Sequence, residues 1–203
     1  MIDLYPCLGD DTSTTGFDAH CLYQEAWAAR RILSAAPSHH VDVGSRTSFV
    51  AVLSAAVPVC FIDIRPLPVK LDGLDCRAGS VLALPFGDAS VNSLSCLHVV
   101  EHVGLGRYGD PLDPEGTRKA ARELCRVLAP GGRLYLSLPI GRPRVMFNAH
   151  RVHDVRTIVD YFSDLSLVEF SGVDDHGACS FSRQLESLDA CDYACGFFLF
   201  RKP

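Results

Sequence analysis

Residues 39–48 read HHVDVGSRTS, and this stretch decides the fold class. Its short apolar run ends at Gly44, which is typical of a buried strand that stops in a tight turn. Residues 48–56, SFVAVLSAA, have the spacing of a helix, and residues 57–64, VPVCFIDI, form a second apolar run. Continuous apolar runs are typical of parallel strands covered on both faces. The order of strand, helix and strand predicts a βαβ unit.

The rest of the chain continues this alternation. The expected elements are a leading helix at 19–36, strands at 79–82, 91–97, 133–138, 165–170 and 193–200, helices at 116–128 and 155–162, and a break at APGG, residues 129–132. We therefore predict one α/β domain, residues 1–203, with a mostly parallel sheet and helices on both faces. Residues 40–203 form its core, and residues 1–18, which lack periodicity, form an arm or a lid.

Composition excludes several classes of protein. The chain has 203 residues, 48% of them hydrophobic, and a net charge of -5, so it has no cationic excess for binding a nucleic-acid backbone. It has no apolar stretch of membrane-spanning length and no signal-like start. Nine scattered cysteines without a CxxC pair argue against a disulfide or zinc framework. We predict a cytoplasmic protein that binds neither nucleic acid nor membrane and holds no metal.

The ends of the predicted strands are where a ligand should bind. In an open α/β sheet, ligands lie beyond the carboxyl ends of the strands. Asp63 follows Asp42 by about twenty residues, the separation at which an acid after the second strand meets a nucleoside ribose. Asp63 could also be a strand-end acid that caps nearby backbone. Arg46 and Phe49 replace two glycines of the GxGxxG dinucleotide motif, which disfavours an NAD-dependent oxidoreductase.

Four longer segments carry a resemblance to a known family. They are VDVGS at 41–45, FIDIRP at 61–66, GSVLALPFGDASVNSLSCLHVVEHV at 79–103 and ELCRVLAPGGRLYLSLPIG at 123–141. Together they resemble the successive motifs of class I S-adenosylmethionine (SAM) dependent methyltransferases, in particular a poorly characterised bacterial branch, over about residues 40–200. The resemblance implies a Rossmann-like seven-stranded sheet, SAM as the cofactor and S-adenosylhomocysteine as the product.

The resemblance also implies site residues. Asp42 and Gly44 would meet the methionine end of SAM, Asp63 its ribose and Ile64 its adenine, while Ser80 takes the place of an acid near the third strand. The full set of implied cofactor-binding residues is Asp42, Gly44, Arg46, Asp63, Ile64, Ser80, Cys96 and Leu97. Arg46 and Ser48 replace the second and third glycines of the family loop. Arg46 could pair with the methionyl carboxylate or could block the site.

Histidines supply the candidates for catalysis. His98 lies just past the fourth predicted strand, beside the expected methyl group, and is the candidate base or acceptor-orienting residue, with a purely structural role as the alternative. His102 is a second candidate, or a packing residue. The polar segment 148–154 is either a substrate loop or a solvated connector. The predicted substrate-binding residues are His102, Asn148, His150 and Arg151.

Two functions follow from these features. The first is a SAM-dependent methyltransferase that acts on a small-molecule or saccharide-like acceptor. The second is a catalytically degenerate domain of the same fold that binds a ligand or a partner, because Arg46, Ser48 and Ser80 depart from the family pattern. The sequence does not indicate an oligomeric state.

Overall fold

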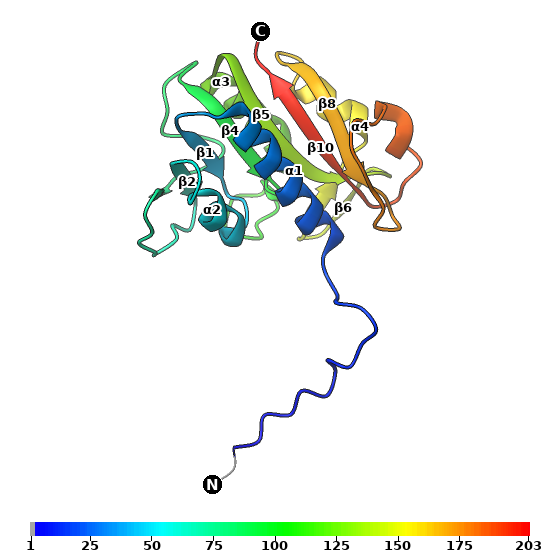
Figure 1. The fold of residues 1–203 in the computed structure, drawn as a ribbon. Helices are drawn as coiled ribbons and strands as arrows, with labels where there is room; N and C mark the ends of the chain where they lie inside the picture. The colour runs from blue at the N-terminus through cyan, green and yellow to red at the C-terminus, as the bar shows by residue number, and fades with distance from the viewer. Residues whose placement is uncertain (1–2) are drawn as a thin grey trace.

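The computed structural model describes residues 3–203, and a single large sheet organises them (Figure 1). Its strand order is β3-β2-β1-β4-β5-β10-β8-β9. The strands are β1 His40–Val43, β2 Val59–Asp63, β3 Leu74–Ala78, β4 Val91–Leu97, β5 Leu128–Ile140, β8 Ser166–Val173, β9 Cys179–Ser180 and β10 Ala194–Arg201. A separate hairpin pairs β6 Arg144–Met146 with β7 His150–Val152.

Strand direction divides the sheet into two parts. The strands β3, β2, β1, β4 and β5 pair in parallel. The strand β10 is antiparallel to both β5 and β8, between which it lies. The carboxyl ends of β1, β2 and β4 therefore meet at one edge of the sheet, where the fold class predicts a ligand site.

Helices cover both faces of the sheet. In Figure 1, α1 Ala19–Ala35 crosses the front face next to α2 Thr47–Leu53, while α3 Gly116–Val127 and α4 Val155–Tyr161 lie behind it. Alternate residues of β10 reach the two layers: Phe197 packs with Trp27 of α1, and Phe198 packs in the cluster on the other face. Trp27 and residues 197–200 are buried. The predicted fold class is confirmed.

The capping of α1 fixes where this helix begins and ends. Asp18 accepts a hydrogen bond from the backbone N–H of Cys21 at 3.0 Å, which satisfies a free donor of the first turn. Ala36 closes the helix in a left-handed conformation. Trp27 donates its indole N–H to Glu169 of β8 at 3.1 Å, and Arg31 forms a bidentate pair with the same carboxylate. These contacts fix α1 across the sheet.

The predicted position of the third strand was wrong. Residues 79–82 form a turn, and the strand is β3, Leu74–Ala78, a few residues earlier. β3 is an edge strand whose exposed face carries Asp75 and Arg77, so its sequence lacks an apolar run, whereas the apolar residues after it cover the sheet end. The predicted break at 129–132 lies within an irregular start of β5. The two-residue β9 makes the sheet eight-stranded instead of seven-stranded.

Residues 3–17 contain no helix or strand, and their side chains are exposed. Figure 1 shows them running away from the domain. These residues form an extended arm, and a role as a lid stays a prediction. No helix within residues 3–203 is long and apolar enough to cross a membrane.

Candidate active site

Two adjoining cavities lie at the carboxyl ends of the parallel strands. The first, here called the strand-end cavity, is lined by residues that follow β1, β2, β3 and β4: Val43, Gly44, Ile62–Arg65, Gly79–Leu82, His98, Val99, His102, Val103, Tyr108 and Asp110. The second, here called the histidine cavity, lies below the start of α1 and is lined by Asp18, His20, Cys21, His98, Glu101, His102, Arg107, His150 and Tyr193. His98 and His102 border both cavities.

Gly44 makes the turn at the end of β1. Its φ is 67°, in the left-handed region that favours glycine, and its N–H donates to the carbonyl of Ile62 at 2.9 Å. A Cβ at this position would stand 3.2 Å from both methyl carbons of Val99. The glycine thus leaves the backbone of the loop open to the strand-end cavity.

Asp42 lies beneath this loop, fully buried, and does not line the cavity. Its carboxylate accepts hydrogen bonds from the backbone N–H of Ser45 at 3.1 Å, from the Ser45 hydroxyl at 2.7 Å and from the Ser95 hydroxyl. The Ser45 oxygen in turn accepts from the N–H of Leu97 at 3.1 Å. Asp42 therefore positions the loop between β1 and β4, and its predicted direct contact with SAM has no support in its orientation.

The same hydrogen-bond network reaches His40. Its two ring nitrogens lie 2.7 Å from the Ser93 hydroxyl and 2.8 Å from the Ser95 hydroxyl. Burial lowers the pKa of His40 to about 3, so the ring is neutral. Burial also raises the pKa of Asp42 to about 6, against the opposing effect of its hydrogen bonds. Nε2–H of His40 donates to Ser95, which can then donate to Asp42.

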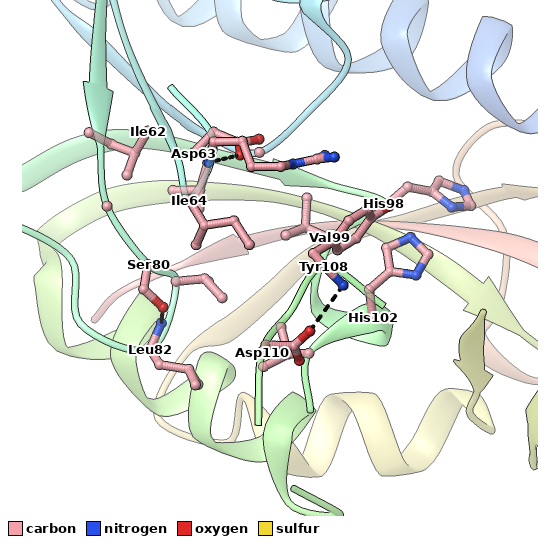
Figure 2. A pocket seen from close by; sticks show the side chains of 16 residues that line it. Ile62, Asp63, Ile64, Ser80, Leu82, His98, Val99, His102, Tyr108 and Asp110 are labelled. Carbon is pink, nitrogen blue, oxygen red and sulfur yellow. Dashed lines mark hydrogen bonds between the residues drawn. The ribbon is translucent and has the colours of Figure 1, made fainter. Parts of the chain in front are cut away.

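Asp63 stands at the end of β2 and lines the cavity, as predicted. One carboxylate oxygen accepts the N–H of Arg65 at 2.7 Å, and the other lies on the side of Gly44, 3.9 Å from where a Cβ there would be. Figure 2 shows Asp63 above Ile64, whose side chain is partly exposed and also lines the cavity. A hydrogen-bond acceptor and an apolar surface thus lie next to each other.

The opposite walls come from two loops. After β3, the Ser80 hydroxyl accepts the N–H of Leu82 at 3.1 Å. After β4, Asp110 accepts the N–H groups of Gly104 at 2.6 Å and Tyr108 at 3.3 Å (Figure 2). The Tyr108 ring lies 4.4 Å below the guanidinium carbon of Arg65, an arrangement that joins the loop to the end of β2.

His98 occupies the border between the cavities. It has a φ of 57°, its Nδ1 lies 2.9 Å from Oε1 of Glu101, and its Nε2 lies 3.1 Å from Sγ of Cys195. Burial opposes charge on His98, but the Cys195 sulfur and the Glu101 carboxylate outweigh it and raise its pKa well above the ordinary value. The Glu101 carboxylate is the cause of the raised pKa of His98, because burial raises the pKa of Cys195 and keeps it an uncharged thiol.

Glu101 is fully buried under the histidine cavity. Burial favours its neutral form, but the positive charges of His98 and the nearby His102 prevail, and its pKa is lowered. Its Oε1 lies 2.9 Å from Nδ1 of His98 and 3.7 Å from Nε2 of His102, but neither Oε1 nor Oε2 has a well-aligned hydrogen-bond partner among the described residues. An ionised carboxylate in such a place needs compensating positive charge.

The remaining histidines of this cavity differ in their surroundings. Nδ1 of His102 lies 2.6 Å from the carbonyl oxygen of Ala149, to which it can donate. His150 packs against Tyr193, with ring centres 5.4 Å apart, and its buried Nε2 has no hydrogen-bond partner among the described residues. Burial lowers the pKa of His150, so this ring is neutral near pH 7.

Besides Asp42, five more predicted site residues line neither cavity. Cys96 and Leu97 are buried within β4, facing the two core layers. Arg46 points toward α1, where its Nε lies 3.6 Å from Glu25. The others belong to the segment around the β6–β7 hairpin: Asn148 is exposed in the turn, and Arg151 is buried, donating to the carbonyls of Val103 and Asp113.

The structure also adds residues that the sequence analysis did not select. Tyr108 and Asp110 face the strand-end cavity from the irregular segment that follows β4. His20, Glu101 and Tyr193 line the histidine cavity, and Cys195 lies directly beside His98. His20 and Cys195 come from opposite ends of the chain, so no local motif indicates that they meet.

The sheet order and the strand-end cavity define a domain of the class I methyltransferase fold, and solved structures agree. The N-methyltransferase NodS from Bradyrhizobium japonicum, in complex with S-adenosylhomocysteine, has a TM-score of 0.61 at 16% identity, covering 90% of this chain and 87% of that one. A Burkholderia thailandensis 1,6-didemethyltoxoflavin-N1-methyltransferase with bound S-adenosylhomocysteine has a TM-score of 0.61 at 14% identity, covering 88% and 78%. The [4+2]-cyclase SpnF has a TM-score of 0.65 at 14% identity, covering 89% and 81%.

Sequence comparison places the chain in a family. It belongs to the family described as "Caenorhabditis protein of unknown function, DUF268", which matches residues 88–202. An uncharacterized methyltransferase from Mycobacterium marinum is 31% identical over 145 residues, which cover 67% of this chain and 50% of that protein. The chain thus spans about half the length of this relative. The predicted membership of the class I methyltransferase superfamily is confirmed.

Proposed function

We propose that this domain is a SAM-dependent methyltransferase that acts on a small polar acceptor such as a saccharide. The observation that carries the proposal is the strand-end cavity, in which the left-handed Gly44, the Asp63 carboxylate and the apolar Ile64 lie together. The cavity borders the histidine cavity through His98 and His102. A cofactor in the first cavity would face an acceptor in the second.

The residues of the strand-end cavity fit SAM. Asp63 keeps one oxygen on the Arg65 amide, which fixes its rotamer, and has the other available for the two ribose hydroxyls. Ile64 and Leu82 offer partly exposed apolar surface for adenine. A side chain at Gly44 would occupy the space next to Val99, so the missing Cβ is what lets a ligand approach the loop.

Bound SAM supplies an activated methyl group, so the protein's main task is to align the acceptor. His98, protonated beside Glu101, suits the orienting role better than the role of a base. His150 suits the removal of a proton better, because it is neutral and its Nε2 is without a partner. The polar lining of the histidine cavity favours an acceptor with several hydrogen-bonding groups.

One of the three departures that suggested the alternative, a catalytically degenerate domain, does not obstruct the cavity. Arg46, the residue that could have blocked the site, is directed toward Glu25 of α1 and does not line the strand-end cavity. A cytoplasmic location also belongs to this proposal, supported by nine cysteines that are all unpaired.

Calorimetric titration with SAM and S-adenosylhomocysteine tests the proposal. The wild-type protein should bind both, and Asp63→Ala should bind at least about tenfold more weakly, because charge-assisted hydrogen bonds are lost. Asp75→Ala, which removes an exposed acid of β3, is the matched control and should bind like the wild type. No binding at millimolar SAM would overturn the cofactor proposal, and equal loss in both variants would overturn the role of Asp63.

The acceptor proposal needs its own experiment. We expect S-adenosylhomocysteine to accumulate when the protein is incubated with SAM and a polyhydroxylated or amine acceptor from a small-molecule panel. His150→Ala should lower the turnover rate while SAM affinity stays unchanged, because His150 lines the histidine cavity and not the strand-end cavity. Unchanged turnover would exclude His150 as the base.

A further inference from the structure

Three metal-binding side chains from distant parts of the chain converge beside the histidine cavity. They are His20 from the first turn of α1, His98 after β4 and Cys195 near the start of β10. One ligand atom of each lies within 4.8 Å of the others, and His98 Nε2 is 3.1 Å from the Cys195 sulfur. The His20 and His98 rings have centres 5.9 Å apart.

We propose that His20, His98 and Cys195 bind a zinc ion. Imidazole nitrogen and thiolate sulfur are the donors that Zn²⁺ prefers, and three protein ligands with an open fourth position are typical of catalytic zinc sites. Tetrahedral zinc bonds of about 2.1 Å to nitrogen and 2.3 Å to sulfur put neighbouring donors roughly 3.5 Å apart. The three donor atoms lie within 4.8 Å of one another, and His98 Nε2 is 3.1 Å from the Cys195 sulfur, so small side-chain rotations would bring them to that spacing.

Glu101 supports the proposed zinc site through its contact with His98. Zinc-binding histidines commonly donate their other ring N–H to a carboxylate, and His98 has Nε2 toward Cys195 and Nδ1 at 2.9 Å from Glu101. The burial of this carboxylate, with neither oxygen in a well-aligned hydrogen bond among the described residues, is otherwise costly. A nearby divalent cation offsets that cost.

The charges balance when zinc binds. Cys195 loses its thiol proton and His98 loses the proton on Nε2, and both protons go to solvent. The two positive charges of zinc then match the Cys195 thiolate and the Glu101 carboxylate.

The open position of the ion would face the polar cavity that holds His150 and Tyr193. An acceptor hydroxyl or amine that coordinates there would lose its proton more readily. This consequence rests on the proposed methyltransferase function, whereas zinc binding itself does not. In the zinc-bound protein His98 is a ligand, and the ion takes over the acceptor-orienting role given above to protonated His98. Sequence spacing gave no reason to expect a metal, since the three ligands share no local motif.

The test uses protein that has been dialysed against a chelator and then titrated with zinc in competition with a chromophoric chelator. We expect one zinc ion per chain, bound with a dissociation constant below about 1 µM. Cobalt in place of zinc should give a sulfur-to-cobalt charge-transfer band. Cys195→Ser should abolish that band, and His20→Ala should weaken zinc binding at least tenfold. Glu101→Gln should weaken it by about 10–100-fold.

Matched controls separate the site from general metal affinity. Cys76→Ser on β3 and His39→Ala before β1 should bind zinc like the wild type. Binding weaker than micromolar, or Cys195→Ser binding as tightly as the wild type, would overturn the proposal. If Cys195→Ser does not fold, as judged by circular dichroism, His20→Ala decides, because His20 is only partly buried on the helix surface.

SAM titration of the same metal-free protein keeps the two proposals apart. Zinc binding without SAM binding would support the metal site and refute the proposed function. SAM binding without zinc binding would support the proposed function and refute the metal site.

Discussion

Replacing Gly44 with alanine tests the loop that organises the strand-end cavity. Gly44→Ala places a residue with a Cβ at φ 67°, and this left-handed conformation destabilises such a residue by about 1–2 kcal/mol. The new Cβ would also stand 3.2 Å from two carbons of Val99, and overpacking of this kind costs about 1–3 kcal/mol. We expect a total loss of roughly 2–5 kcal/mol in the free energy of unfolding, or a Tm lower by roughly 4–20 °C.

Gly131→Ala is the control for strain alone. Gly131 has a φ of 77°, but its nearest neighbour would be 3.8 Å from the new Cβ, so only the 1–2 kcal/mol of backbone strain should appear. Thermal unfolding followed by circular dichroism gives the comparison, and calorimetry gives the SAM affinity. Gly44→Ala should also weaken SAM binding at least about tenfold, equivalent to 1.4 kcal/mol, while Gly131→Ala should not. Equal effects of the two variants would refute the reasoning.

Two further predictions concern buried polar groups. His40 binds a proton in the unfolded state but not in the native state between about pH 6.5 and 3, so it destabilises the fold as the pH falls, by about 2 kcal/mol from pH 7 to 5. Asp42, with its raised pKa, has the opposite effect of about 1 kcal/mol, but it is present in both proteins, so their difference isolates His40. When the pH is lowered from 7 to 5, urea unfolding should show that His40→Gln loses about 2 kcal/mol less stability than the wild type. Glu169→Gln should lower the free energy of unfolding by about 1–3 kcal/mol, because it breaks the partly buried bidentate pair with Arg31, measured by the same urea unfolding at pH 7.

Controls for these two variants are available on the surface. His39→Gln replaces the exposed neighbour of His40 and should keep the pH dependence of the wild type. Asp75→Asn breaks the exposed pair with Arg77 and should change stability by well under 1 kcal/mol. Unchanged pH dependence in His40→Gln, or a Glu169→Gln effect as small as that of Asp75→Asn, would contradict the assigned energetics.

Most of the fold was predictable because burial leaves a pattern in the sequence. The strands β1, β2, β4 and β10 lie in the interior of the sheet, so their residues form continuous apolar runs that can be recognised without a structure. The position of β3 was not predicted, because this edge strand carries alternating charged residues instead of an apolar run. The hairpin of β6 and β7 was missed because its strands are only three residues long and carry Arg144, His150 and Arg151 instead of an apolar run.

The site was predictable only where it depends on the ends of strands. Gly44, Asp63, Ile64, Ser80 and His98 all line the strand-end cavity, because the parallel topology alone brings strand ends to one edge. Side-chain direction within an element was not predictable in this way.

Arg46 and Cys96 illustrate the limit. Arg46 turns toward Glu25, a residue on a helix whose path across the sheet the sequence did not reveal. Cys96 faces the core because successive residues of a strand point to opposite faces, so a strand end offers only some of its residues to a ligand. Contacts between distant segments, such as His20 with Cys195, require the whole fold.

The position of β10 between β5 and β8 has a consequence for how the protein is made. β10 follows both of its neighbours in the chain, so on the ribosome the strands β5 and β8 exist before the strand that joins them. Until residue 201 emerges, two apolar strand edges lack their partner and Cys195 has not reached His98. Synthesis that stalls before this point would therefore leave a chain that is both prone to aggregate and without a complete histidine cavity.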